Sequence, residues 1–147
     1  MGRYRFTAQV GAPPDRVFDL WTDVDRFKEW IGGVTGVTDV SGPLDEAGTR
    51  YTVLFGGMQS RTEVLEVERP HLIRTRFGNR VLKGETVATF EPDGAGTLLT
   101  QELRTEGLIS AVMARIFATG SWRGSFQGEL NTFAALAERD AATPTPG

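Results

Sequence analysis

Few side chains in this sequence could act together as an acid, a base or a nucleophile. There is no cysteine, and His71 is the only histidine, so thiol catalysis, disulfides and thiolate metal sites are excluded. A Ser-His-Asp triad would need His71 as its base. However, His71 follows Arg69-Pro70 at a predicted turn, and no serine lies in a nucleophile-elbow motif. We therefore expect a solvated turn histidine, no metal site and no cofactor.

Glu63 is a weak candidate for catalysis. It stands in a charged run between Arg61 and Arg69 on a predicted strand. Such a run is typical of a solvated strand face, although Arg61 and Glu63 could also line the wider end of a cavity. One arginine or glutamate could assist enolisation of a bound ketone.

Arg123 is the second weak candidate. If the C-terminal segment is one ideal helix, Arg123 falls inside the apolar stripe, between Ile116 and Leu130, where an unpaired guanidinium would be very costly. Two explanations stay open. Arg123 could point into a cavity and pair with a polar ligand oxygen, or with Glu63 or Gln101. Alternatively, the helix breaks near Gly120, or the side chain reaches water; the sequence does not settle whether the helix continues through Gly120.

Small and polar residues on the predicted strands could leave room for a ligand. Gly84, Thr86, Ala88 and Phe90 share one strand face, and close-packed interiors leave little space unfilled. Either the long helix approaches closely there or the space holds a ligand. Thr75, Thr86 and Gln101 would then be the polar groups that orient an apolar molecule.

Hydrophobic periodicity predicts the elements that position these residues. A period of two predicts a first strand at 3–10, and helical spacing then predicts two short helices at 15–22 and 24–30. A helical pattern returns from 108 to 139. Between these helical regions, the period of two predicts six strands, at 34–40, 49–55, 58–68, 72–77, 81–91 and 96–105.

The short loops between these strands favour an antiparallel meander. A seven-stranded sheet has one face to cover, and only the C-terminal helix is long enough, at about 45 Å. The sheet must therefore curve round that helix. We expect one α+β domain at 1–139 and a disordered C-terminal tail at 140–147.

Composition excludes several partners. The formal net charge is -3, and no basic stripe is available to neutralise phosphates, so we expect no nucleic-acid partner. No apolar run approaches the roughly 20 residues that span a bilayer, so we expect no membrane insertion. We expect a cytoplasmic protein that is a monomer or a homodimer.

Two segments resemble a known family. The segment 10–30, which reads VGAPPDRVFDLWTDVDRFKEW, resembles the start of the START-like (SRPBCC) superfamily, and 67–73 is similar to the turn before that family's fifth strand. The resemblance implies the helix-grip fold, in which a curved sheet grips the C-terminal helix. Members bind lipids, sterols, polyketides, quinones or hormones, and only some are enzymes. No universal catalytic motif exists to transfer.

The resemblance and the pattern together predict a cavity between the sheet and the C-terminal helix that binds a small hydrophobic molecule, such as a lipid, polyketide or aromatic. The alternative is an enzyme of the polyketide cyclase/aromatase or dehydratase type acting in the same cavity. The expected ligand-binding residues come from the second short helix, the strands and the long helix: Trp30, Phe55, Thr75, Phe77, Thr86, Ala88, Gln101, Leu103, Phe117, Arg123, Phe126 and Gln127.

Overall fold

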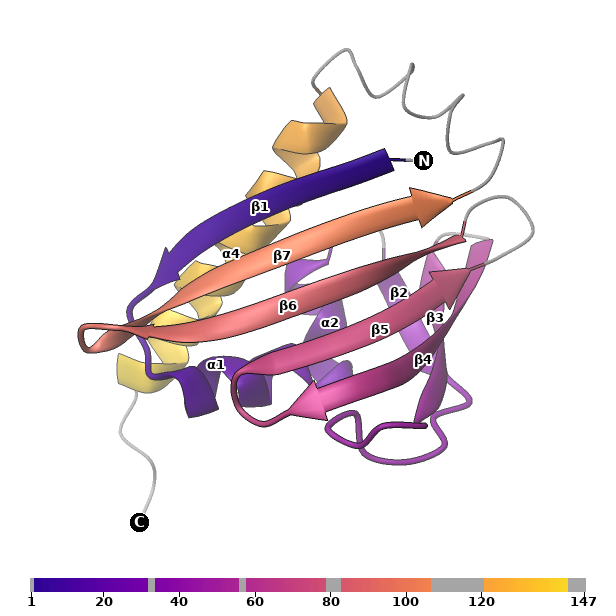
Figure 1. Cartoon of the computed structure of the whole chain (residues 1–147), viewed down its shortest axis with the longest axis horizontal. Coiled ribbons are helices and arrows are strands. Elements are labelled where there is room, and N and C mark those ends of the chain that lie inside the picture. The colour runs from indigo at the N-terminus through magenta and orange to yellow at the C-terminus, as the bar shows by residue number, and fades with distance from the viewer. Residues whose placement is uncertain (1, 32–33, 56–57, 79–82, 107–120, 143–147) are drawn as a thin grey trace.

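The computed structural model describes residues 2–31, 34–55, 58–78, 83–106 and 121–142. Helices and strands follow in the expected order along the chain (Figure 1). The elements are β1 (Gly2–Val10), α1 (Pro14–Trp21), a 3-10 turn (Val24–Arg26), α2 (Phe27–Trp30), β2 (Val34–Thr38), β3 (Arg50–Phe55), β4 (Met58–Glu68), β5 (Leu72–Gly78), β6 (Lys83–Asp93), β7 (Gly96–Glu106) and α4 (Ser121–Ala142).

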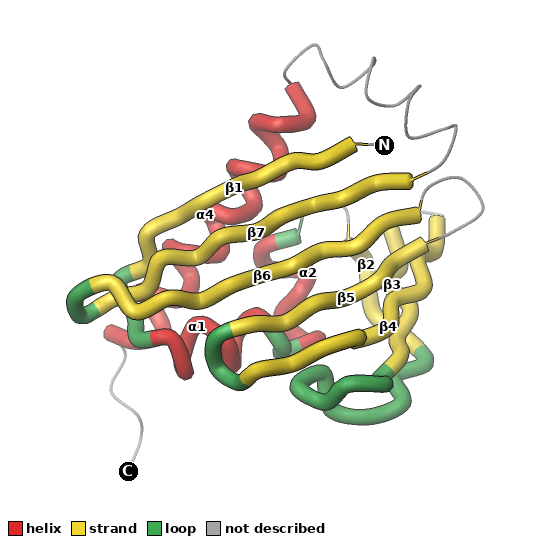
Figure 2. Tube along the Cα trace, in the orientation of Figure 1, coloured by secondary structure: helices red, strands yellow, loops and turns green. Residues whose placement is uncertain are grey.

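All seven strands form one antiparallel sheet in the order β1-β7-β6-β5-β4-β3-β2. The meander from β2 to β7 confirms the prediction from the short loops. The helices lie on one face of the sheet, and β2 and β3 curve back behind β4 and β5 (Figures 1 and 2). The architecture is therefore the predicted α+β helix-grip fold.

Most strand and helix boundaries lie within two residues of the sequence prediction, and two larger differences concern the helices. The helix predicted at 24–30 is divided into the 3-10 turn and the single turn of α2. The Asp23 carboxylate accepts a hydrogen bond from the Asp25 backbone N–H at 3.2 Å, which caps the 3-10 turn. Helix α4 ends at Ala142 rather than at 139.

The face of the sheet that contacts the helices is called the inner face. From α1, Val17 and Phe18 are fully buried against it, and from α4, Leu130 and Phe133 are at most 1% exposed. Alternation along the strands puts charged residues on the opposite, outer face. There, Glu63 lies directly across from Arg76 on the neighbouring strand.

Helix α4 is fastened to the first strand and the loop after it. The Gln127 side-chain amide donates to the Thr7 carbonyl at 3.0 Å, and the Gly11 backbone N–H donates to the Glu138 carboxylate at 2.8 Å. Since β1 is an edge strand, the first contact satisfies a backbone group that no neighbouring strand pairs. These contacts fix the helix across the β1 side of the inner face.

Candidate ligand-binding site

The register of the sheet brings the predicted polar residues together. Thr86 lies directly opposite Thr75 on β5 and Leu103 on β7. Gln101 pairs with Ala88, one row away on the same face. Phe77 lies opposite Gly84. These pairings confirm the predicted arrangement of the strand residues on one face.

Four of the predicted residues, Thr75, Phe77, Thr86 and Gln101, form what we call the inner-face patch. Each of them is partly exposed. Yet the patch is surrounded on the same face by buried side chains, which are Val64 (1% exposed), Ile73 (3%), Ala88 (0%) and Leu103 (7%). The helices and neighbouring side chains therefore leave the inner-face patch incompletely covered.

Three other predicted ligand residues are covered by protein atoms. Ala88 and Leu103 are buried in the core beside the inner-face patch. Trp30 is 7% exposed, and its ring meets Phe133 at a centroid distance of 4.9 Å and Trp21 at 4.9 Å. Trp30 therefore packs the second short helix onto the core.

Glu63 lies on the outer face, opposite in direction to its buried neighbours Thr62 and Val64. Its carboxylate accepts a hydrogen bond from Arg76 at 3.1 Å and lies 3.9 Å from Arg50. These ion pairs place Glu63 on a charged strand face, which was one of the two positions that the sequence had left open for it; the other was the lining of a cavity. The structure therefore does not direct its carboxylate toward the inner-face patch.

Gln127 lies beside the edge strand. Besides its bond to Thr7, its side-chain amide donates to the Asn131 side-chain oxygen at 3.0 Å. Its nitrogen is thus occupied by protein partners, and its role toward a ligand stays a prediction. His71 is an exposed residue of the β4–β5 turn, as expected.

The remaining predicted residues fall outside the described side chains. Phe117 lies outside the described residues, as does the continuity of the long helix through Gly120. Phe55, Arg123 and Phe126 belong to described strands or helices, but their side chains lie outside the description. Their roles stay predictions.

Tyr51 and Thr62 form a buried polar pair that the sequence analysis missed. They lie opposite each other on β3 and β4, are both 8% exposed, and share a side-chain hydrogen bond. Burial raises the pKa of the Tyr51 hydroxyl well above its ordinary value of 10. The alternation of β3 and β4 could have placed both residues on the inner face, but it gave no sign of their pairing.

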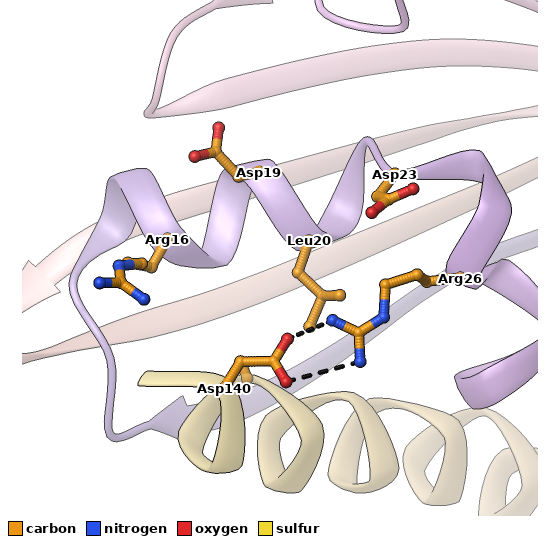
Figure 3. A pocket seen from close by; sticks show the side chains of 7 residues that line it. Arg16, Asp19, Leu20, Asp23, Arg26 and Asp140 are labelled. Carbon is orange, nitrogen blue, oxygen red and sulfur yellow. Dashed lines mark hydrogen bonds and ion pairs between the residues drawn. The ribbon is translucent and has the colours of Figure 1, made fainter. Parts of the chain in front are cut away.

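A separate surface pocket of about 180 Å³ lies between α1 and the end of α4 (Figure 3). Its walls carry charges that are mostly paired. Arg26 donates a hydrogen bond to the Asp140 carboxylate of α4. It also donates to the Glu29 carboxylate, at 2.7 Å. Asp19 forms an ion pair with Arg69. The pocket is far more charged than the inner-face patch, and the Arg26–Asp140 ion pair joins α4 to the 3-10 turn after α1.

The described part of the chain shows neither a metal centre nor a spanning helix. Among its residues, no three histidine, cysteine, aspartate or glutamate side chains gather closely enough to hold a metal ion. None of its helices combines the length and hydropathy needed to cross a membrane.

Solved structures share this fold at low sequence identity. Protein MLL2253 from Mesorhizobium loti is 18% identical, with a TM-score of 0.74 over 94% of this chain and 98% of that one. TTHA0849 from Thermus thermophilus is 19% identical, with a TM-score of 0.68 over 97% and 100%. DynU16, described as a putative protein in the dynemicin biosynthetic locus, is 23% identical, with a TM-score of 0.69 over 95% of this chain but 48% of its own.

Among curated proteins, none matches this sequence significantly. A family model described as polyketide cyclase / dehydrase and lipid transport does match, over residues 1–138. That match spans nearly the whole chain and agrees with the observed helix-grip architecture. The chain therefore belongs to the polyketide cyclase/dehydrase and lipid transport family.

Proposed function

We propose that the protein binds a small, largely apolar molecule, such as a lipid, polyketide or aromatic compound, against the inner-face patch. One observation carries this proposal. Thr75, Phe77, Thr86 and Gln101 keep accessible surface although fully or nearly fully buried residues surround them on the same face. Protein interiors are ordinarily close-packed, so accessible surface amid core residues is suited to a guest molecule.

The chemistry of the patch fits an apolar guest with few polar groups. Phe77 and the buried neighbours offer apolar contact, worth about 25 cal/mol per Å² of apolar surface removed from water, less the costs of association. The two threonine hydroxyls and the Gln101 amide can each donate or accept a hydrogen bond. Such sparse polar groups orient a ligand in an otherwise apolar site.

Binding is favoured over catalysis by the charges of the inner face. Among the described strand residues that point inward, none is a carboxylate or an imidazole, and the Glu63 carboxylate is ion-paired on the outer face. General acid–base catalysis needs a proton donor or acceptor tuned near the working pH. An enzyme of the cyclase or dehydratase type would therefore depend on Arg123, the weak candidate that remains.

The proposal is tested with N-phenyl-1-naphthylamine, an uncharged apolar dye whose emission rises on leaving water. We expect it to bind the wild-type protein. Thr86→Phe places a large ring on the inner-face patch and is expected to weaken dye binding at least tenfold. Val87→Phe adds a similar ring to the next residue of β6, on the outer face, and should leave the affinity within twofold.

Circular dichroism checks that both variants fold, and Thr75→Phe is the substitute on β5 if Thr86→Phe does not. Equal dye binding by wild type and a folded inner-face variant would contradict the proposal. Native mass spectrometry of the purified protein, with extraction of any retained compound, would identify the natural ligand. The same spectra would test the expected monomer or homodimer, and a fluorescent fusion would test the expected cytoplasmic location.

A further inference from the structure

The charged residues of the sheet are unevenly distributed along its strands. We call the end where β1 begins and β5 and β7 finish the patch end, because the register places Thr75, Phe77 and Thr86 in its last rows. Cations outnumber carboxylates in the strands there. The cations are Arg3, Arg50, Arg61, Arg76, Lys83 and Arg104, and the carboxylates are Glu63, Glu85 and Glu106.

The opposite end of the sheet, where α1 and the end of α4 lie (Figure 1), has the reverse excess. In the helices and strand ends there, the carboxylates are Asp15, Asp19, Asp23, Asp25, Glu29, Glu68, Glu91, Asp93, Glu138 and Asp140, and the cations are Arg16, Arg26, Lys28, Arg69 and Arg139. The whole chain has a net charge of -3. The cation excess at the patch end is therefore produced by the fold and not by the composition.

The cations of the patch end lie behind the inner-face patch. Arg76 stands between Thr75 and Phe77 on β5, so alternation puts its side chain on the outer face of the same strand segment. Arg3 and Arg61 make no ion pair with any residue that the structure describes. A guest on the inner-face patch would thus lie in the field of cations that are only partly neutralised.

This field acts on the charge of a guest without direct contact. At a separation of about 10 Å in water, two unit charges change a binding constant by roughly twofold. Several cations on one side add their effects, and a site with low-dielectric walls concentrates the field. Phe77 is next to the last residue of β5, so a charged group on the guest can remain in water beyond the strand end while the apolar part contacts the patch.

We propose that the patch end selects an apolar guest that carries a negative charge, such as a hydrophobic carboxylate, over its neutral analogue. This inference rests on the proposed function and narrows it, because a neutral lipid or a neutral aromatic compound gains nothing from the field. Attraction through the field also accelerates the encounter of an anionic guest with the patch at low salt.

The test compares two dyes with the same aromatic framework. N-phenyl-1-naphthylamine is neutral, and 8-anilino-1-naphthalenesulfonate carries one added sulfonate. Fluorescence titration gives both dissociation constants, and their ratio cancels the contribution of the shared rings. Raising the ionic strength from about 0.01 M to about 1 M shortens the Debye length from roughly 30 Å to 3 Å. This change should weaken the binding of the sulfonate relative to the neutral dye.

Matched variants test where the field originates. At low salt, Arg61→Glu should lower the relative affinity for the sulfonate about threefold, as for a change of two unit charges near 10 Å. Arg16→Glu makes the same change of charge on α1, at the opposite end, and should alter the ratio by less than about 1.5-fold because the charge is farther away. Glu85→Gln removes a carboxylate from the patch end and should raise the ratio up to about twofold, a change of opposite sign.

The inner-face variant Thr86→Phe shows whether the sulfonate binds at the patch, because it should weaken both dyes. Sulfonate binding that Thr86→Phe leaves unchanged would overturn the inference. An affinity ratio that ignores salt and is equal in Arg61→Glu, Arg16→Glu and Glu85→Gln would also overturn it, while binding of both dyes would leave the proposed function standing. Binding of neither dye would contradict the proposed function, and the inference with it.

Discussion

The ring of Phe77 on β5 lies over the α-carbon of Gly84 on β6. A Cβ atom added to Gly84 would come within 2.9 Å of Phe77 Cζ and would also meet the backbone carbonyl of Arg104. The sequence had offered two uses for the small residues of β6, close approach of the long helix or room for a ligand. At Gly84, the Arg104 carbonyl of β7 and the Phe77 ring of β5 take the space instead.

This contact predicts that Gly84→Ala destabilises the protein by about 1–3 kcal/mol, as expected for overpacking in a tight interior. The Arg104 carbonyl belongs to a central strand and cannot move away without disturbing the sheet. Urea denaturation monitored by circular dichroism measures the change.

The matched control for Gly84→Ala is Gly128→Ala on α4, where nothing lies within 4 Å of an added Cβ. Alanine has the higher helix propensity, so that variant should be neutral or more stable by up to about 1 kcal/mol. Equal effects at the two positions would refute the contact between Phe77 and Gly84. Gly128 is also exposed, so close packing is not the reason for this glycine in the helix.

Tyr51 is expected to resist ionisation. Burial raises the pKa of its hydroxyl, so the folded state holds its proton above pH 10, where an unfolded tyrosine loses it. The contribution of protonated Tyr51 to the free energy of unfolding is therefore fully present below about pH 10 and is lost as the pH rises further. The chain has two tyrosines, so absorbance at 295 nm in Tyr4→Phe reports Tyr51 alone.

If the titration of folded Tyr4→Phe, followed at 295 nm, has its midpoint at pH 10, then Tyr51 is not buried as described. Addition of urea provides the reference, because it should release the phenol to titrate near its ordinary value.

Arg26 makes the acid stability of the protein depend on Glu29. The hydrogen bond from Arg26 lowers the pKa of the Glu29 carboxyl below its ordinary value of 4.5. Because the pKa of Glu29 is lowered in the folded state, its pair with Arg26 stabilises the protein above about pH 4.5. This stabilisation is lost as the pH falls through the folded-state pKa. Glu29→Gln should therefore narrow the gap in Tm between pH 6 and pH 3.

Glu85→Gln is the control for Glu29→Gln, since it removes one carboxylate from the outer face, away from Arg26. A fall in Tm toward pH 3 that is equally steep in Glu29→Gln and in wild type would argue against the pair. High salt should also reduce the difference, because both side chains are partly exposed and exposed ion pairs are screened.

The sequence by itself determined the fold class of this protein and the order of its elements along the chain. Alternation and helical spacing are local properties, so they fixed the number, order and facing of the strands, and short loops fixed the meander. For the same reason Thr75, Thr86 and Gln101 could be assigned to one face and one neighbourhood, because register follows from alternation and turn length.

The tertiary structure decided what local patterns do not encode. The pairing of β1 with β7, the overlap of Phe77 with Gly84, and the bond between Tyr51 and Thr62 join residues far apart in the chain or depend on side-chain packing. The sequence left two roles open for Glu63, on a solvated strand face or at the end of a cavity. Its ion pair with Arg76 places it on the outer face. Only three-dimensional packing shows which inward residues stay accessible, because the burial of a residue depends on all of its neighbours at once.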